Sequence, residues 1–299
     1  MRVTLIDAHH HLWDLKNSYP WLNDANDPHF FLGPYDDLKK NYLWPDYEKD
    51  ISDHQVLATV HCEAEWARDD QVGETQWLTD MHQRIGHPSA IVAHAWFHTD
   101  NCEEILARQA SFPLVKGIRS KPVTSSRPDN MQSGLTGSMQ DSRWLDGFSK
   151  LAKYGLSWDL RVPYWHLYEA ADVADAFPET PIVLNHTGFP WDRSEEGLRA
   201  WRQAMERIAD CSNVWLKVSE FGLKDRPWNY DENNRIVQDA LSIFGIDRCM
   251  FASNFPVAKL RIDFNNLVTS VAKMISHYKP QQQENFFVRN AANFYRLLI

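Results

Sequence analysis

The chain has 299 residues, of which 43% are hydrophobic and 24% are charged, and its formal net charge is −9. This composition fits a globular protein with a large core, and the negative charge, without any Lys/Arg run, argues against a nucleic-acid or anionic-membrane surface. Four scattered cysteines lack zinc-finger spacing, so we expect structural thiols in a reducing cytoplasm. We also expect no signal peptide and no membrane span.

The first apolar segment ends in a cluster of three histidines. Strand alternation sends His9 and His11 to one face and His10 to the other. Two imidazoles two residues apart at a strand end can share one metal ion or orient one water. Trp13 then opens a stretch rich in Trp, Tyr and Pro, residues 13–45, which has no sustained periodicity. We predict an aromatic loop that covers the end of the first strand.

Beyond residue 50, short apolar runs alternate with segments of helical spacing. The sequence predicts further strands at residues 56–62, 90–97, 114–119, 156–162, 181–186, 214–219 and 249–253. It predicts helices at 69–85, 103–110, 141–154, 167–177, 234–244, 264–277 and 281–298, and one after the N-cap Ser194. The acidic tract 225–232 is expected to be a solvated loop.

Eight strands that alternate with helices indicate a parallel α/β fold. Their number and the chain length favour a closed (β/α)8 TIM barrel over an open doubly wound sheet. No glycine-rich phosphate loop follows the first strand, which argues against nucleotide binding. We therefore predict a single barrel domain over residues 1–299, with the long aromatic loop after strand one.

The carboxyl ends of the strands in such a barrel face one pocket. His186 ends the sixth strand, where its ring can complete a three-histidine cluster with the first-strand pair. Arg119 ends the fourth strand, and its guanidinium is predicted to bind a substrate carboxylate bidentately. Arg161 and Lys217, from strands five and seven, are predicted to belong to structural ion pairs.

Several motifs resemble the amidohydrolase superfamily: His-x-His after strand one, His-x-Gly after strand six, and Ser-Asn-Phe-Pro after strand eight. The segments IDAHHHLWDL, YPWL, VLNHTGFP, WLKVS and RNAANFYRL look more narrowly like its lactonase-type branch, which includes sugar-acid, fucono- and pyrone-dicarboxylate lactonases. The resemblance spans the whole chain. It implies a (β/α)8 hydrolase that opens a lactone, with one divalent metal or with none.

The chain departs from that pattern at the end of strand eight. Most of the superfamily has an aspartate there, which takes the proton from the attacking water, whereas this chain has Asn254. An amide cannot act as a base near neutral pH and is a poorer cation ligand than a carboxylate. Two alternatives therefore stay open: a non-catalytic or altered relative that binds a small molecule, and a related decarboxylase.

The sequence favours an enzyme that opens a cyclic ester of a sugar acid or a related carboxylated ring. His9, His11 and His186 are predicted to hold the attacking water, either directly or through one divalent metal, with zinc the first choice. Asn254 is predicted to orient water or substrate. Arg119, Trp13 and His61 are predicted to bind the substrate. The expected partner is a small molecule, and the sequence leaves self-association into a homo-oligomer open.

Overall fold

The computed structural model describes residues 1–299, and its eight parallel strands form one sheet in sequence order. The strands are β1 (Thr4–His10), β2 (Gln55–Cys62), β3 (Ala90–Ala93), β4 (Val115–Ile118), β5 (Ser157–Leu160), β6 (Ile182–Leu184), β7 (Val214–Val218) and β8 (Cys249–Phe251). The helices are α1 (Pro20–Asn23), α2 (Trp44–Asp50), α3 (Gly73–Ile85), α4 (Cys102–Ala110), α5 (Ser142–Ser149), α6 (Leu167–Ala176), α7 (Glu195–Ala209), α8 (Tyr230–Phe244), α9 (Phe264–Met274), α10 (Pro280–Glu284) and α11 (Asn290–Tyr295).

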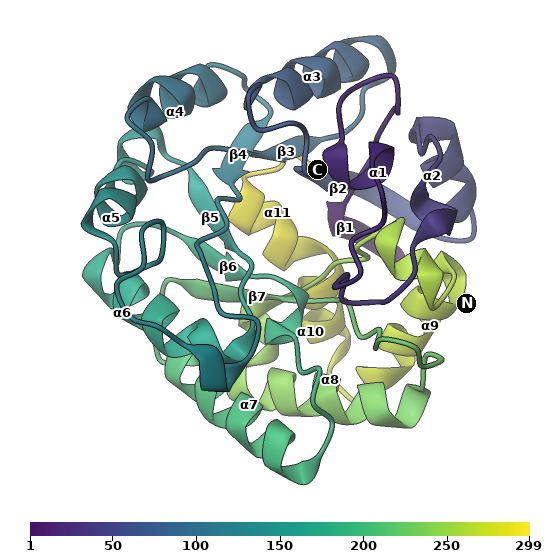
Figure 1. The fold of residues 1–299 in the computed structure, drawn as a ribbon. Coiled ribbons are helices and arrows are strands. Elements are labelled where there is room, and N and C mark those ends of the chain that lie inside the picture. Colours follow the sequence, from purple (N-terminus) through teal and green to yellow (C-terminus); the bar gives the residue numbers. More distant parts are fainter.

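The sheet closes into a barrel where the first strand meets the segment after the last. The backbone N–H of Asn254 donates to the His9 carbonyl at 2.7 Å, and that of His11 donates to the Phe255 carbonyl at 2.7 Å. Helices surround the strands on the outside (Figure 1). The predicted (β/α)8 barrel is therefore confirmed.

The helix signals in the sequence correspond to real helix ends. Ser194 caps α7, since its side chain accepts a hydrogen bond from the N–H of Gly197. The predicted apolar stripe of this helix is buried against the barrel: Leu198, Trp201, Met205 and Ile208. Helix α3 ends at Gly86, whose φ of 78° is the left-handed conformation that glycine adopts readily.

Two predicted segments differ from the structure near the end of the chain. Residues 281–298 are not one helix, because the π-helical turn Asn285–Arg289 separates α10 from α11. The acidic tract 225–232 is not wholly a loop, because α8 begins at Tyr230 and places Asp231 and Glu232 in its first turn. Acidic side chains stabilise the positive end of a helix dipole, which explains their place there.

The aromatic stretch after β1 is an ordered loop that holds only short helices. The Trp21 indole donates to the Ala64 carbonyl at 2.9 Å, and the Tyr35 hydroxyl donates to the Trp21 carbonyl at 3.0 Å. Aromatic rings with a polar end suit such positions, because they bury area while the polar group keeps a partner. The loop therefore lies over β1 and β2 at their carboxyl ends.

All four cysteines are free and buried. Burial raises the pKa of the Cys102 and Cys211 thiols to about 11. Such thiols carry little thiolate at neutral pH and serve as packing groups, in agreement with the structural role predicted for them. No helix in the structure combines the length and apolar character that crossing a bilayer requires.

Candidate active site at the carboxyl ends of the strands

Three imidazoles meet where β1 and β6 end. The ring centroid of His9 lies 5.0 Å from that of His11 and 4.7 Å from that of His186. All three side chains are buried. The structure thus brings together the N-terminal pair and the sixth-strand histidine, although 175 residues separate His11 from His186 in the sequence.

Burial keeps these three histidines uncharged. Desolvation lowers the pKa of each imidazole well below its usual range, because the charged form loses its water. Neighbouring cations lower the pKa further: Lys217 acts most on His9 and Arg161 acts most on His186. At neutral pH the site therefore offers neutral imidazoles, the form that accepts a proton or binds a metal.

Each ring also has a defined neighbour on Nδ1. The His11 Nδ1 is 2.7 Å from the Cys62 carbonyl oxygen, which can only accept a hydrogen bond. The proton of His11 therefore lies on Nδ1, and Nε2 has the lone pair. The His186 Nδ1 is 3.1 Å from the Ser219 hydroxyl. His9 differs, because its Nδ1 lies 3.4 Å from the Lys217 ammonium, a donor. This contact favours a proton on the His9 Nε2, which is buried without a protein partner.

The turns after three consecutive strands have left-handed backbone at non-glycine residues. The φ angles of His186, Glu220 and Asn254, which follow β6, β7 and β8, are 58°, 54° and 56°. Such conformations cost about 1–3 kcal/mol each and occur preferentially at functional sites. Here the residues concerned lie at or beside the histidine cluster.

Asp7 fixes the first strand against the last turn. Its buried carboxylate accepts from the Ser253 N–H at 2.9 Å, from the Ser253 hydroxyl at 2.6 Å and from the Tyr47 hydroxyl at 2.8 Å. Since Ser253 precedes Asn254, this network positions Asn254 relative to His9 and His11. Asp7 supports the site and lines no cavity in it.

Asn254 connects a histidine to a buried carboxyl group. Its Oδ1 lies 3.2 Å from the His11 Nε2, and its Nδ2 donates to Glu220. Burial raises the pKa of Glu220 to about 7. When Glu220 is protonated, the amide can turn so that Oδ1 accepts from Glu220 and Nδ2 donates to the His11 lone pair. The Glu220 carboxyl group therefore contacts Asn254, and Asn254 in turn contacts His11.

A charged network lies directly beneath the histidines, and we call it the floor network: Lys217, Asp159 and Tyr295. The Lys217 ammonium pairs with the Asp159 carboxylate, and both side chains are 0% exposed. The Tyr295 hydroxyl donates to the same carboxylate at 3.0 Å. Every charge in this network has a partner within the chain.

Two groups of side chains near His9 have metal-binding chemistry. His9, Cys62 and Asp159 place ligand atoms within 4.8 Å of one another, but the Lys217 ammonium lies beside His9 and pairs with Asp159 there. A metal ion bound there would lie next to the Lys217 ammonium and would be repelled by it. The three histidines are the better set chemically, because imidazole nitrogen is a common zinc ligand. Their ring nitrogens do not all lie within 4.8 Å of one another, so the rings would have to move closer together, and the His9 Nε2 would have to give up its proton, before they held one divalent ion.

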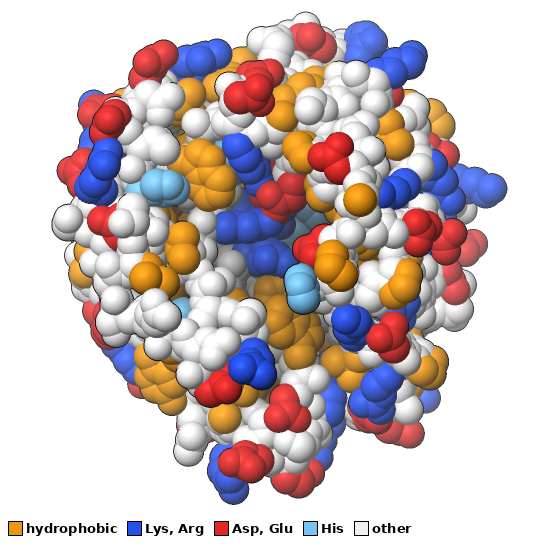
Figure 2. Space-filling model, in the orientation of Figure 1, with side chains coloured by type: hydrophobic (Ala, Val, Ile, Leu, Met, Phe, Trp, Pro, Cys, Tyr) orange, Lys and Arg blue, Asp and Glu red, His pale blue; other side chains and the backbone are white.

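A small cavity lies at the histidine cluster, and we call it the inner cavity. Its volume is about 70 Å³, and its lining includes His11, His186 and Asn254 but not His9. It joins an outer cavity of about 680 Å³, and the two share Trp21, Phe30, Phe31, Glu65, Lys121 and Arg161. In Figure 2, Lys and Arg side chains gather in the central hollow of this face.

Three other predicted site residues occupy different positions. Arg119 lines the inner cavity, but its guanidinium is bound to Glu63. Trp13 is fully buried and its indole donates to the Lys40 carbonyl at 2.7 Å, so it does not line the inner cavity. His61 is also fully buried, with Nε2 3.3 Å from the Leu12 carbonyl. Neither Trp13 nor His61 lines the inner cavity, and their contact with substrate stays a prediction.

Sequence reasoning missed four residues at this site. Glu220 directly follows the predicted seventh strand, and continuing that strand by one residue would have included it. Arg161 was assigned to an ion pair, yet it has no acidic partner. Phe31 and Phe189 have no sequence signal that distinguishes them from core aromatics.

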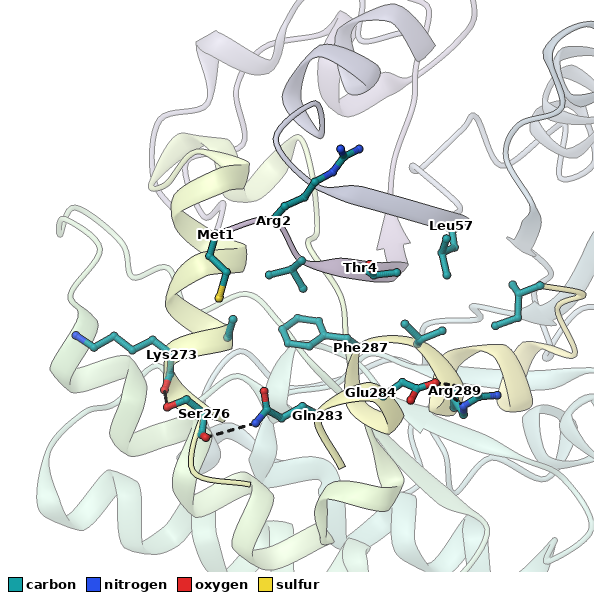
Figure 3. Close-up of a pocket in the computed structure, with 14 residues that line it drawn as sticks. Met1, Arg2, Thr4, Leu57, Lys273, Ser276, Gln283, Glu284, Phe287 and Arg289 are labelled. Atoms are coloured by element: carbon teal, nitrogen blue, oxygen red, sulfur yellow. Dashed lines mark hydrogen bonds and ion pairs between the residues drawn. The ribbon is translucent and has the colours of Figure 1, made fainter. Parts of the chain in front are cut away.

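Another cavity lies elsewhere in the molecule. It measures about 850 Å³ and is lined by residues that include Met1, Thr4, Leu57 and Phe287 (Figure 3). Thr4 begins β1, whereas the histidines follow its end. No histidine or cysteine lines this cavity. The chemistry of the molecule is therefore concentrated at the opposite end of the barrel.

The chain is similar to known proteins over nearly its whole length. The chain is 34% identical over 298 residues, 99% of each chain, to the uncharacterized protein y4mH of Sinorhizobium fredii. It is 24% identical over 289 residues to an L-fucono-1,5-lactonase of Burkholderia multivorans, covering 91% of this chain and 89% of that one.

Solved structures share the fold at low sequence identity. An amidohydrolase of Burkholderia multivorans with bound zinc has a TM-score of 0.80 at 21% identity, over 99% of this chain and all of that one. A 2,6-dihydroxybenzoate decarboxylase from Rhizobium has a TM-score of 0.61 at 13% identity, over 99% and 98% of the two chains. The family model for amidohydrolases matches residues 6–297, so the chain belongs to the amidohydrolase family.

Proposed function

We propose that the protein opens a lactone, the cyclic ester of a sugar acid or a related carboxylated ring, by adding water positioned by histidines. The observation that carries this proposal is the cluster of three neutral imidazoles, two of which, His11 and His186, line a cavity together with basic side chains. A neutral imidazole can accept a proton from water, and a nearby donor can stabilise charge that develops on the carbonyl oxygen.

The neighbours of the three rings suggest distinct roles. The lone pair of His11 takes one proton from the water as its oxygen attacks the lactone carbonyl carbon, and the lone pair of His186 accepts a hydrogen bond from the other hydrogen. The His9 Nε2–H, which the Lys217 ammonium favours, donates to the carbonyl oxygen. The bond between the acyl carbon and the ring oxygen then breaks, and the ring oxygen receives the proton. Asn254 orients the water or the substrate next to His11.

This mechanism requires no metal, and the three rings would have to move closer together to bind one. His9, His11 and His186 would hold one divalent ion, in keeping with the predicted choice of zinc. When bound, such an ion supplies Lewis-acid polarisation and lowers the pKa of the attacking water to about 7. Metal analysis of protein purified without chelator or a histidine tag measures its occupancy.

The test is acid release from a panel of sugar-acid and carboxylated lactones, followed with a pH indicator. We expect His9→Ala to lower the rate on the best substrate by about 10²–10⁴-fold, the usual contribution of a positioned acid or base. His277→Ala is the matched control, because this histidine is exposed near the end of α9.

Three results would overturn the proposal. The first is the absence of acid release from every lactone although the panel compounds bind, which favours a non-catalytic binding protein. The second is carbon dioxide release from an acid without ester cleavage, which favours a decarboxylase. The third is equal activity of His9→Ala and His277→Ala.

A further inference from the structure

Positive charge exceeds negative charge around the two cavities of the candidate site. Three carboxylates lie at these cavities: Glu65 lines both, Asp27 lines the outer one, and Glu63 borders them through its pairs with Arg68 and Arg119. Four cations surround them: Arg68, Arg119, Lys121 and Arg161. A chain with a net charge of −9 thus has a local cationic excess at this one place. Such an excess within a cavity favours an anionic ligand.

Three of the four cations already have partners. The Arg119 Nε lies 2.6 Å from a Glu63 carboxylate oxygen, and its Nη2 donates to the Glu63 carbonyl. Arg68 pairs with Glu63 at 2.9 Å, and Lys121 pairs with Glu65. Binding a ligand bidentately through Arg119 would require breaking a buried ion pair, which is costly.

Arg161 is the exception. It makes no ion pair or hydrogen bond with the protein, and its guanidinium lies over the rings of Phe31 and Phe189, 5.8 Å and 5.0 Å from the ring centroids. Aromatic faces hold a cation without occupying its N–H groups. Burial, and then the charge of Arg119, lowers the pKa of Arg161 to about 10, so it stays charged at neutral pH.

Arg161 lies at the junction of the two cavities, close to the histidine cluster. It lines the inner cavity together with His186, and it also lines the outer cavity. The inner cavity, of about 70 Å³, is far smaller than an ordinary ligand pocket, so it has room for the reacting ester group but not for a whole substrate. The outer cavity, of about 680 Å³, has the size of an ordinary ligand pocket.

We propose that Arg161 binds a carboxylate of the substrate, so that the protein acts on cyclic esters that carry a carboxylate close to the reacting carbonyl. This inference rests on the proposed function and assigns the anchoring role to Arg161 in place of Arg119. The guanidinium edge binds the carboxylate bidentately between the two phenyl rings, which also cover the apolar face of the substrate ring.

The direct test is calorimetric binding of two rings that cannot be hydrolysed: tetrahydropyran-2-carboxylate and its neutral carboxamide. We expect the wild type to bind the carboxylate at least 10-fold more tightly than the amide. Arg161→Met should remove that preference, and Arg161→Lys should restore only part of it, because an ammonium cannot bind bidentately. Thermal melting checks that the variants fold, and we expect Arg161→Met to melt as the wild type does.

Arg127→Met is the matched control, because it removes the same charge from an exposed site outside both cavities. Equal binding of acid and amide to the wild type would overturn the proposal, as would equal carboxylate affinity in the Arg161→Met and Arg127→Met variants. These measurements report binding and do not require the protein to catalyse a reaction. If the carboxylate binds but no lactone is opened, only the proposed function is contradicted. If lactones are opened at rates that depend neither on a substrate carboxylate nor on Arg161, only this inference is contradicted.

Discussion

The floor network and the lining of the inner cavity surround their cations in opposite ways. In the floor network, the fully buried Lys217 has a carboxylate and a tyrosine ring next to it, so no free charge remains to bind a ligand. In the cavity lining, the half-buried Arg161 lies between two aromatic rings and has no acidic partner. A cation in a cavity therefore indicates a binding site only when the chain does not itself supply the counter-charge.

The largest effect is expected in the floor network. Lys217→Met leaves the Asp159 carboxylate buried without a cation, and breaking such a pair costs about 3–5 kcal/mol. Chemical denaturation of the variant measures this loss. A double variant, Lys217→Met with Asp159→Asn, should recover part of it, because no unpaired charge remains. A loss below 1 kcal/mol for the single variant would contradict the assignment of this pair to stability.

A smaller effect is expected at Arg119, which shares a cavity with Arg161 but is paired like the floor network. Arg119→Met should lower stability by about 2 kcal/mol, because Glu63 loses one of its two cations and keeps Arg68. Arg161→Met should not lower it. If urea denaturation gave equal losses for the two variants, the distinction between paired and unpaired cations would fail.

The smallest effect depends on pH and concerns Glu220, the unpaired acid behind Asn254. Burial raises its pKa to about 7 from the usual 4.5, so the folded chain holds this proton more tightly than the unfolded chain. Its contribution to stability is present below pH 4.5 and is lost as pH rises to about 7. Glu220→Gln cannot ionise, and should gain on the order of 1 kcal/mol over the wild type between pH 5 and pH 8.

Melting temperatures of the Glu220→Gln variant and the wild type at both pH values measure this gain. The comparison cancels the opposite contribution of the buried histidines, which both proteins share. A constant difference between the two proteins at pH 5 and pH 8 would contradict the raised pKa. Glu232→Gln is a suitable control, because Glu232 is an acid in the first turn of α8.

The barrel and the histidine cluster were predictable because each rests on local sequence patterns. Apolar runs define the strands, and parallel strands place their carboxyl ends on one face, so His9 and His186 converge although they are far apart in sequence. The bulge in β1 after Asp7 changes the strand register locally, and strict alternation does not foresee it. It did not prevent His9 and His11 from lying close together.

The pairing of the charges was not predictable, because it depends on contacts between distant residues. Arg119 and Glu63 are 56 residues apart, and no local pattern joins them. The same holds for Lys217, whose acid comes from β5, and for Arg161, whose neighbours come from the aromatic loop and from the turn after β6. Which guanidinium remains free is decided by packing, not by residue type.

The burial of the four thiols has a practical consequence for following the molecule in solution. Thiol reagents attack thiolates, and the raised pKa values of Cys102 and Cys211 leave little thiolate at neutral pH. A cysteine introduced at the exposed Ser126, at the rim of the outer cavity, would thus react far ahead of the native ones. A single fluorophore attached there would report ligand entry without a cysteine-free background.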